Sequence, residues 1–384
     1  MDLAKKHNKS LAICMIVKNE QESLPKTISN NIKYSDKVIL VDTGSDDSTV
    51  NIAKELGAEI YHFKWNNNFA DARNFSISKA KEDWILWLDA DEYIDELSFK
   101  AIRGFLDGTE ADVVRIPIYE CQYGETNGDS FYMRDKIFRN NKGACFTKSA
   151  NEQLVFPENT KVSVVDFLGA RICHWGLHLS AEAMEKKMGP RIELLKKIAA
   201  ENREDYSVRY LLGMRYSEMK LPQEALGYYS QAVSICEKEA STDRQKKYFM
   251  HAALAKKAQI LLESGHGEEA LAEALAAIKL DPMFLEPCDT AAMALIKLGK
   301  YEEALELTEQ MLKLPKIQHP VLMFNEQKWG SLIYVLHIRA LLKAIGKAAA
   351  ISFAEGILKN KPDNIDMAQM LDIIKTLEII RGMP

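Results

Sequence analysis

The sequence predicts an α/β domain of the Rossmann-like type followed by an all-α domain of helical repeats. Between residue 11 and about residue 172, short apolar segments alternate with helical patterns, which is typical of a largely parallel sheet with helices on its faces. After about residue 180 the strand patterns end, and the sequence is rich in Ala, Leu, Glu and Lys, which favour helices. A chain of 384 residues is also long enough for two hydrophobic cores.

The elements of the first half follow from the apolar pattern. The run Trp84-Ile-Leu-Trp-Leu88 is apolar throughout, as expected for a strand that is covered on both faces, and it stops abruptly at Asp89. We expect strands at residues 11–17, 38–41, 59–63 and 84–88, and helices at residues 22–32, 48–56 and 69–80.

The second half repeats a short motif in which Glu-Ala-Leu begins a helix. The alanines of three copies, Ala225, Ala270 and Ala304, are separated by 45 and then 34 residues. The second spacing equals the tetratricopeptide period, and we expect the 11 additional residues of the first spacing in the charged stretch 237–247. Small residues also recur where paired helices would approach closely: Gly213, Ala258 and Ala292, and Ala232 and Ala277. A degenerate final repeat is expected at residues 329–345 and 348–358, with a capping helix at residues 366–380.

We therefore expect a disordered N-terminus at residues 1–9, the α/β domain at 10–180, a connecting helix at 181–204 and tetratricopeptide-like repeats at 205–384. No apolar run reaches the roughly 18 residues that cross a bilayer, and the polar first ten residues lack the core of a signal peptide. These features favour a cytoplasmic protein without an integral membrane segment. The six cysteines form no C-x-x-C pair, which argues against a zinc site, and the net charge of −5 argues against nucleic acid as a partner.

Two carboxylates, Asp89 and Asp91, follow the buried strand at residues 84–88. Burying unpaired charge is costly, so a bound cation or ligand is expected there. Carboxylates at a strand end suit Mn²⁺ or Mg²⁺, which would bridge diphosphate oxygens. An isolated D-x-D triplet also occurs in solvated turns and helix caps, so its context decides between the two interpretations.

Two further segments place polar residues near the same sheet edge. Asp42 ends the strand at residues 38–41, at the edge where open α/β sheets bind ligands. Asp46, Asp47 and Ser48 after it are better explained as caps of the next helix. Arg73 near a helix start suits a diphosphate or a carboxylate, and a surface salt bridge is the alternative.

Four segments in order resemble the successive motifs of family 2 glycosyltransferases: residues 13–20, 41–49, 69–74 and 88–92. The resemblance covers roughly residues 10–180, and four ordered motifs are far more specific than one. It implies a GT-A fold and a nucleotide-sugar donor, usually a uridine diphosphate sugar, with inversion at the anomeric carbon.

The same resemblance implies roles for single residues. Val17, Lys18 and Asp42 would contact the uridine, Asp89 the ribose or the sugar, and Asp91 the metal. Lys18 departs from the aromatic residue often found at its position, which puts base stacking in doubt. The full donor site implied by the resemblance comprises Val17, Lys18, Glu20, Asp42, Ser45, Arg73, Asp89, Ala90 and Asp91.

Residues 132–140 and 149–154 are similar to segments of the branch that includes bacteriocin peptide S-glycosyltransferases and some envelope-sugar transferases. In that comparison Asn151 replaces the usual histidine. An inverting transfer needs a base for the acceptor proton, and Glu152 is the candidate. The alternatives are Glu120 or Asp135 as the base, or a Glu152 that merely pairs with Arg134 or Arg139.

A histidine after the last predicted strand closes the metal shell in these families. His174 fits that position and would bind the ion together with Asp91, with His178 as the alternative. The predicted cofactor is therefore a divalent metal, Mn²⁺ or Mg²⁺.

The predicted function is transfer of a hexose or N-acetylhexosamine from a UDP-sugar to a peptide or protein side chain, either a Ser or Thr hydroxyl or a Cys thiol. A repeat array offers a concave surface for an extended acceptor and a candidate surface for homodimerisation. The alternatives are transfer to a cell-envelope saccharide or lipid, and a non-catalytic scaffold with a degenerate transferase domain. A nucleotidyltransferase ranks last because the sequence lacks a Gly- and Lys-rich phosphate loop.

Overall fold

The computed structural model describes residues 8–121, 131–150, 152–175, 181–238, 244–282, 285–313, 333–360 and 364–381. The chain forms two compact units that divide between Lys187 and Met188. Residues 1–7 of the expected N-terminal tail lie outside the described residues. Asn8 and Lys9 are ordered, because their backbone N–H groups donate to Asp107 Oδ1 over 3.0 and 3.2 Å.

The first unit is built on a nine-stranded sheet with the order β3-β2-β1-β4-β7-β6-β11-β5, in which β10 also pairs with β6. β7 is antiparallel to both of its neighbours, so β4 and β6 run in the same direction, and β11 runs parallel to β6. The strands are β1 (Leu11–Val17), β2 (Lys37–Asp42), β3 (Glu59–His62), β4 (Trp84–Trp87), β5 (Glu92–Tyr93), β6 (Val113–Glu120), β7 (Phe131–Arg139), β10 (Val164–Asp166) and β11 (Ile172–His174).

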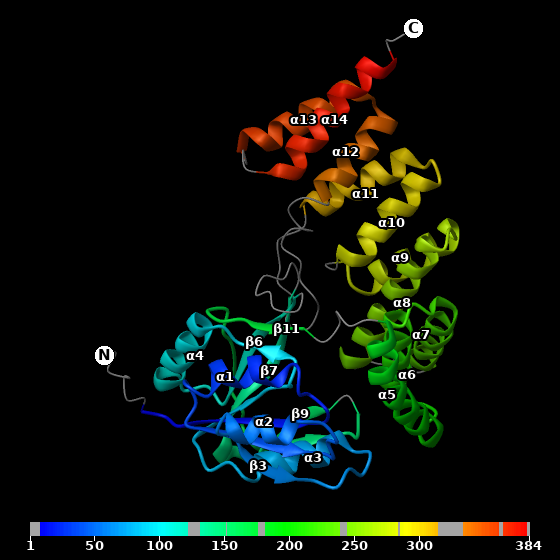
Figure 1. Ribbon diagram of the computed structural model, residues 1–384. Helices are drawn as coiled ribbons and strands as arrows, with labels where there is room; N and C mark the ends of the chain where they lie inside the picture. Colours follow the sequence, from blue (N-terminus) through cyan, green and yellow to red (C-terminus); the bar gives the residue numbers. More distant parts are fainter. Residues whose placement is uncertain are drawn as a thin grey trace. The chain divides into compact units, whose positions relative to one another are not determined.

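Helices cover both faces of this sheet (Figure 1). Alternate residues of β1 pack into two different cores: Ile13 contributes to the cluster under α1, α2 and α4, and Cys14 to the cluster under α3. The hairpin of β8 (Cys145–Thr147) and β9 (Gln153–Val155) lies on the α3 side. The helices are α1 (Leu24–Asn31), α2 (Thr49–Glu55), α3 (Phe69–Ile77) and α4 (Glu96–Gly108), with a short 3₁₀ turn at Asn140–Lys142.

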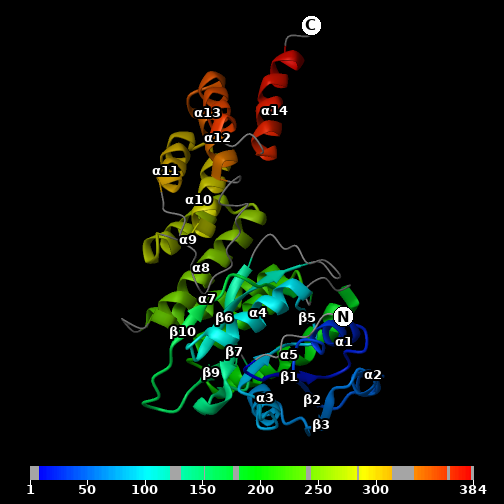
Figure 2. The same ribbon diagram turned by 90° about the vertical axis from the view of Figure 1, so that its left-hand side faces the viewer.

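The second unit is a succession of antiparallel helices that stack in chain order (Figure 2). The small residues predicted to lie between helices are buried: Ala258, Ala292, Ala232 and Ala277 are each 0% exposed. The helices are α5 (Ala181–Glu201), which spans the division between the units, α6 (Tyr206–Glu218), α7 (Pro222–Glu237), α8 (Arg244–Glu263), α9 (Gly267–Leu280), α10 (Leu285–Lys297), α11 (Tyr301–Lys313), α12 (Ile333–Ala344), α13 (Lys347–Asn360) and α14 (Ile365–Arg381).

The fold class is confirmed: a Rossmann-like α/β unit precedes a tetratricopeptide-like helical unit. The irregular first spacing has a visible cause, since α8 has 20 residues where α10 has 13. Part of the stretch expected to hold the additional residues, 239–243, lies outside the described residues, as do residues 329–332 of the expected final repeat. Among the helices that the structure describes, none is both long and apolar enough to cross a bilayer.

Gly213 lies where α6 and α7 pack closely together. A Cβ built on Gly213 in α6 would lie 2.6 Å from the ring of Tyr229 in α7, whereas one built on Gly227 would meet nothing within 4 Å. We expect Gly213→Ala to lower the free energy of unfolding by about 1–2 kcal/mol, because overpacking outweighs the gain in helix propensity.

The matched variant Gly227→Ala should raise the free energy of unfolding by up to about 1 kcal/mol, because it removes only the entropic cost of a helical glycine. Hydrogen exchange of α6 and α7 peptides measures both values within the second unit. Equal effects of the two substitutions would show that the Tyr229 ring moves aside.

Candidate active site

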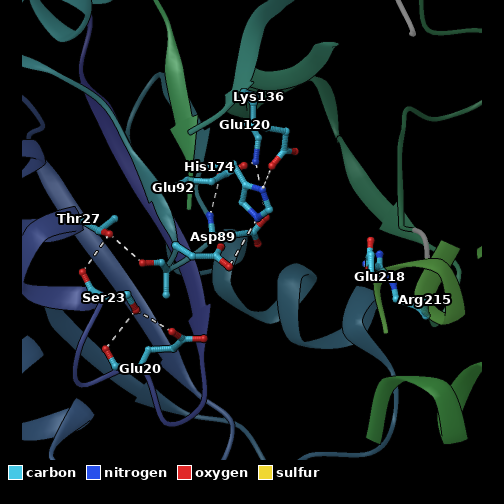
Figure 3. Close-up of polar contacts among 12 residues, drawn as sticks. Glu20, Ser23, Thr27, Asp89, Glu92, Glu120, Lys136, His174, Arg215 and Glu218 are labelled. Carbon is cyan, nitrogen blue, oxygen red and sulfur yellow. Dashed lines mark hydrogen bonds and ion pairs between the residues drawn. The ribbon is translucent and has the colours of Figure 1, made fainter. Parts of the chain in front are cut away.

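Charged side chains from four strands meet at one edge of the sheet (Figure 3). Asp89 and Asp91 follow β4, Glu120 ends β6 and His174 ends β11, while Lys136 lies within β7. The carboxyl ends of strands that run in the same direction share one edge, so residues far apart in sequence become neighbours. The structure thus brings together Asp89, Asp91 and His174, as the sequence predicts.

The turn Asp89-Ala90-Asp91 (the D-A-D turn) is fixed by hydrogen bonds from three other residues of the chain. The backbone N–H of Asp89 donates to Glu92 Oε2 over 2.9 Å, and Thr27 Oγ1 on α1 donates to the carbonyl of Ala90 over 2.8 Å. The backbone N–H of Trp175 donates to the carbonyl of Asp91 over 2.9 Å. The turn is therefore held in place before any ligand arrives.

Asp89 lies between two cations. Its Oδ1 is 3.4 Å from Arg73 Nη2, and its Oδ2 is 3.7 Å from Lys136 Nζ. Burial alone would raise the pKa of Asp89, but the charges of Arg73 and Lys136 outweigh it and hold the pKa below its usual value. Asp89 is consequently an anion that can accept two hydrogen bonds from a ligand hydroxyl pair.

His174 bridges two carboxylates. Its Nδ1 is 2.9 Å from Glu120 Oε2, and its Nε2 is 3.6 Å from Asp91 Oδ2. Burial alone would lower the pKa of His174, but the hydrogen bonds to Asp91 and Glu120 outweigh it, so the pKa lies well above its usual value. A carboxylate on Nδ1 fixes the ring and directs Nε2 outward, an arrangement typical of metal-binding histidines.

The candidate base Glu152 contacts Arg73. Their Oε1 and Nε atoms are 3.5 Å apart, and both side chains are largely buried. Arg73 also stacks on Trp87, with 4.4 Å between its guanidinium carbon and the ring centroid. Arg73 is thus a shared neighbour of Asp89 and Glu152, which brings the candidate base near the D-A-D turn.

The alternatives for Glu152 fare differently. Arg139 lies beside Asp112 with 3.9 Å between its Nε and Oδ1, and Arg134 stacks on the ring of Tyr132, so the suggested pairing of Glu152 with either arginine is wrong. Glu120 is already bonded to His174. Asp135 pairs in register with Arg115 on β6, and its charged neighbours are Arg115, Arg134 and Asp166 rather than the residues of the site.

On the nucleotide side, the loops after β1 and β2 are tied together. Asp42 accepts backbone N–H groups of Gly44 and Ser45 over 3.2 and 3.0 Å, and Gly44 has φ +108°. Ser45 Oγ accepts the N–H of Asn19 over 3.0 Å, and the carbonyl of Val17 accepts the N–H of Thr43 over 3.0 Å. Asp42 therefore shapes the turn in addition to any contact with ligand.

The remaining residues of this region have contacts of their own. Lys18 is exposed, and the carboxylate of Glu20 accepts the hydroxyl of Ser23 over 2.6 Å. Asp47 Oδ1 accepts the N–H of Thr49 over 2.9 Å, as expected for a residue that caps the start of α2. Ser48, the N-cap residue, makes no side-chain cap bond.

No cluster of three or more His, Cys, Asp or Glu side chains in the described part of the chain forms a ready-made metal cage. The site instead offers two side-chain ligands, Asp91 and His174. This number suits an ion that takes its other ligands from phosphate and water. The alternative ligand His178 lies outside the described residues, as does Asn151.

Three residues of this site have no assigned role in the sequence prediction: Glu92, Lys136 and Thr27. Glu92 and Lys136 form a buried ion pair with 2.6 Å between Oε2 and Nζ, and Thr27 holds the D-A-D turn. Lys136 is one of four charged residues in the nine-residue strand β7, so the sequence alone does not single it out. Its partner becomes apparent only from the pairing of β7 with β4.

Residues 12–161 match the family model described as glycosyl transferase family 2. This part of the chain is a family 2 glycosyltransferase domain. Its matched span includes the D-A-D turn, Arg73, Lys136 and Glu152, whereas His174 lies beyond it.

Three curated relatives resemble this glycosyltransferase domain and its surroundings. A TPR repeat-containing protein of Synechococcus elongatus is 36% identical over 142 residues, 37% of this chain and 34% of the relative. An uncharacterized glycosyltransferase of Rickettsia typhi is 26% identical, covering 59% of this chain and 77% of the relative. The SPbeta prophage-derived glycosyltransferase SunS of Bacillus subtilis is 26% identical, covering 57% of this chain and 52% of the relative. The chain thus spans between about a third and three quarters of the length of these relatives.

Among solved structures, the chain is similar to S. aureus TarS 1-349. The superposition covers 76% of this chain and 92% of the TarS chain, with 14% sequence identity and a TM-score of 0.35. A score this low describes a distant likeness.

The histidine of the glycosyltransferase domain gives a pH prediction for the metal-free protein. Because its carboxylate partners raise the folded-state pKa of His174, its protonation stabilises the fold below the unfolded-state pKa of about 6.5, and this stability is lost as pH rises through the folded-state pKa. Wild type should therefore exceed His174→Gln in Tm at pH 6, and the difference should shrink toward pH 9.

Differential scanning fluorimetry with a chelator measures this Tm difference. His62→Gln is the control, because the His62 side chain is 70% exposed and its replacement removes little packing. A Tm difference for His174→Gln that stays constant from pH 6 to pH 9 would contradict the prediction.

Proposed function

We propose that this protein transfers a hexose or N-acetylhexosamine from a UDP-sugar to a peptide or protein side chain, with a divalent metal and with inversion at the anomeric carbon. The observation that carries the proposal is the pair Asp91 and His174, 3.6 Å apart at the end of a fixed D-A-D turn in a family 2 glycosyltransferase domain. The resemblance to family 2 motifs supports the nucleotide-sugar donor.

The donor would lie along the edge formed by the loops after β1, β2 and β4. The loop containing Asp42 and Ser45 is braced against residues 17–19 and provides a preformed rim for the uridine. Asp89, held as an anion by Arg73 and Lys136, would accept hydroxyls of the ribose or the sugar.

Charge balance supports a divalent cation. In the network around the D-A-D turn, five carboxylates face three groups that carry positive charge, which leaves two negative charges when His174 is protonated. Asp91 and neutral His174 Nε2 would hold Mn²⁺ or Mg²⁺, which stabilises the charge that develops on a departing diphosphate. The carboxylates are Asp89, Asp91, Glu92, Glu120 and Glu152, and the cationic groups are Arg73, Lys136 and His174.

Glu152 is the proposed base. It would take the proton from the acceptor hydroxyl or thiol as that atom attacks the anomeric carbon, opposite the bond to the diphosphate. Arg73 beside it links its position to that of Asp89. The same arginine therefore orients the base and the donor-binding carboxylate.

A peptide acceptor fits the second unit, because tetratricopeptide-like helices present an extended surface that suits an unfolded chain. Transfer to a cell-envelope saccharide or lipid is the second candidate. The intact charge network of the first unit argues against a scaffold that has lost catalysis.

Removal of the proposed metal ligand tests the donor site. We expect wild type to bind UDP in the presence of Mn²⁺, and Asp91→Ala to weaken this binding at least about 100-fold, because the ion loses its carboxylate ligand. Isothermal titration calorimetry measures both affinities. Asp166→Ala on β10 is the control, since Asp166 pairs with Arg115 near the start of β6, away from the site. Unchanged UDP binding by Asp91→Ala would exclude the proposed metal site.

Replacement of the proposed base separates chemistry from binding. Glu152→Gln should lower the rate of UDP release from a UDP-sugar by about 10²–10⁴-fold while donor affinity stays within about twofold, because the amide cannot accept the proton. Glu158→Gln, an exposed glutamate six residues further on, should behave as wild type in the same coupled assay. Normal turnover by Glu152→Gln would assign the base to another carboxylate.

A further inference from the structure

Lys136 is a buried cation at an irregularity of β7. Between β6 and β7 the register pairs Val114 with Ile137 but Arg115 with Asp135, so Lys136 is one additional residue on β7, a β-bulge. Three consecutive residues, 136–138, are buried, which departs from the alternation of a regular strand. Bulges beside binding sites commonly redirect a side chain, and this one lies where β7 runs next to the end of β4.

The bulge directs the Lys136 ammonium toward two carboxylates of the D-A-D turn. Lys136 Nζ is 2.6 Å from Glu92 Oε2 and 3.7 Å from Asp89 Oδ2 (Figure 3). Glu92 Oε2 also accepts the backbone N–H of Asp89. One carboxylate oxygen of Glu92 thus joins Lys136 to the backbone of the turn, while Lys136 contacts the Asp89 side chain directly.

Stability alone does not account for this arrangement. Glu92 and Lys136 are 2% and 6% exposed, and desolvation of a buried ion pair commonly cancels its Coulombic gain. Apolar residues of similar volume would serve a core equally well or better. The ammonium instead connects the turn to β7, because it contacts the Asp89 carboxylate and the Glu92 oxygen that accepts the Asp89 N–H. Without it, this connection is lost and the turn is free to move away from β7.

We infer that Lys136, aimed by the β-bulge, is a positioning residue that holds the D-A-D turn and the Asp89 carboxylate in the geometry that receives the donor. This inference rests on the proposed function for the nature of the donor. The positioning itself does not depend on which ligand binds, so the two can be tested separately.

The test uses the full chain with the double substitution Lys136→Met and Glu92→Gln. Removing both charges together leaves no uncompensated charge in the core, which keeps the variant foldable. The amide introduced by Glu92→Gln retains an oxygen that can accept the Asp89 N–H. The variant therefore removes the ion pair and the contact of Lys136 with Asp89 but keeps this backbone hydrogen bond. The matched control is Lys257→Met with Glu273→Gln, another pair with 2.6 Å between Nζ and Oε1, which joins α8 and α9.

Hydrogen exchange of a peptide covering residues 88–93 in the unliganded protein is the deciding measurement. We expect at least about tenfold faster exchange at the turn in the double variant and no change there in the control pair. The single variant Lys136→Arg keeps the positive charge, so hydrogen exchange at its turn should be almost as slow as in wild type. Unchanged exchange at the turn in the double variant would overturn the inference.

Calorimetric binding of UDP with Mn²⁺ then links the turn to the proposed function. The double variant should bind about 10- to 100-fold more weakly than wild type, the range seen when residues that orient metal ligands are replaced. Wild-type affinity in a variant whose turn exchanges faster would also overturn the inference. If wild type itself binds no UDP, the proposed function fails, and the exchange result still decides whether Lys136 holds the turn.

Discussion

The contact between the Lys136 ammonium and the carboxylates of Glu92 and Asp89 is the interaction on which the rest of the site depends. It places a positive charge behind the D-A-D turn, where two acidic side chains would otherwise repel each other. Around this contact, Thr27 and Trp175 fix the turn backbone from α1 and from the residue after β11. Asp91, at the end of the same turn, lies beside His174 Nε2. The turn therefore has a cation near each of its two aspartates when His174 is protonated.

This arrangement requires a sheet in which one antiparallel strand interrupts a parallel series. β7 lies between β4 and β6 and runs in the opposite direction. The carboxyl ends of β4 and β6 therefore lie at the edge of the sheet that carries the site, and β7 contributes Lys136 from within the strand. β11 then pairs parallel with β6 and sets His174 directly opposite Glu120. The hydrogen bond between their side chains orients the imidazole toward Asp91. The carboxylate beside His174 Nδ1 and the carboxylate beside its Nε2 thus come from the ends of different strands, β6 and β4.

Arg73 couples two functions that the sequence places far apart. Its guanidinium stacks on Trp87 and lies within 3.5 Å of both Asp89 and Glu152. Stacking on an aromatic ring leaves the edge of the planar guanidinium group available to carboxylates, which lysine could not reproduce. Arg73 therefore relates the position of the candidate base to that of the donor-binding turn. All of these contacts lie within the first unit, and the regular packing of small residues in the helical unit is a separate structural problem.

The two-part architecture follows from the sequence alone, because periodicities of strand and helix and the recurrence of Glu-Ala-Leu are local properties of the chain. The positions of Asp42 and Asp89 at the ends of strands follow from it as well, since an apolar run that ends at a carboxylate is visible without a fold. The position of Glu152 beside Arg73, and not beside Arg134 or Arg139, becomes apparent only in the folded chain, because strand alternation around a bulge sets where each side chain points. The role of Lys136 was equally hidden: the segment around Ile137 and Phe138 does not reveal its partner, and Glu92 reaches it only because β7 pairs with β4.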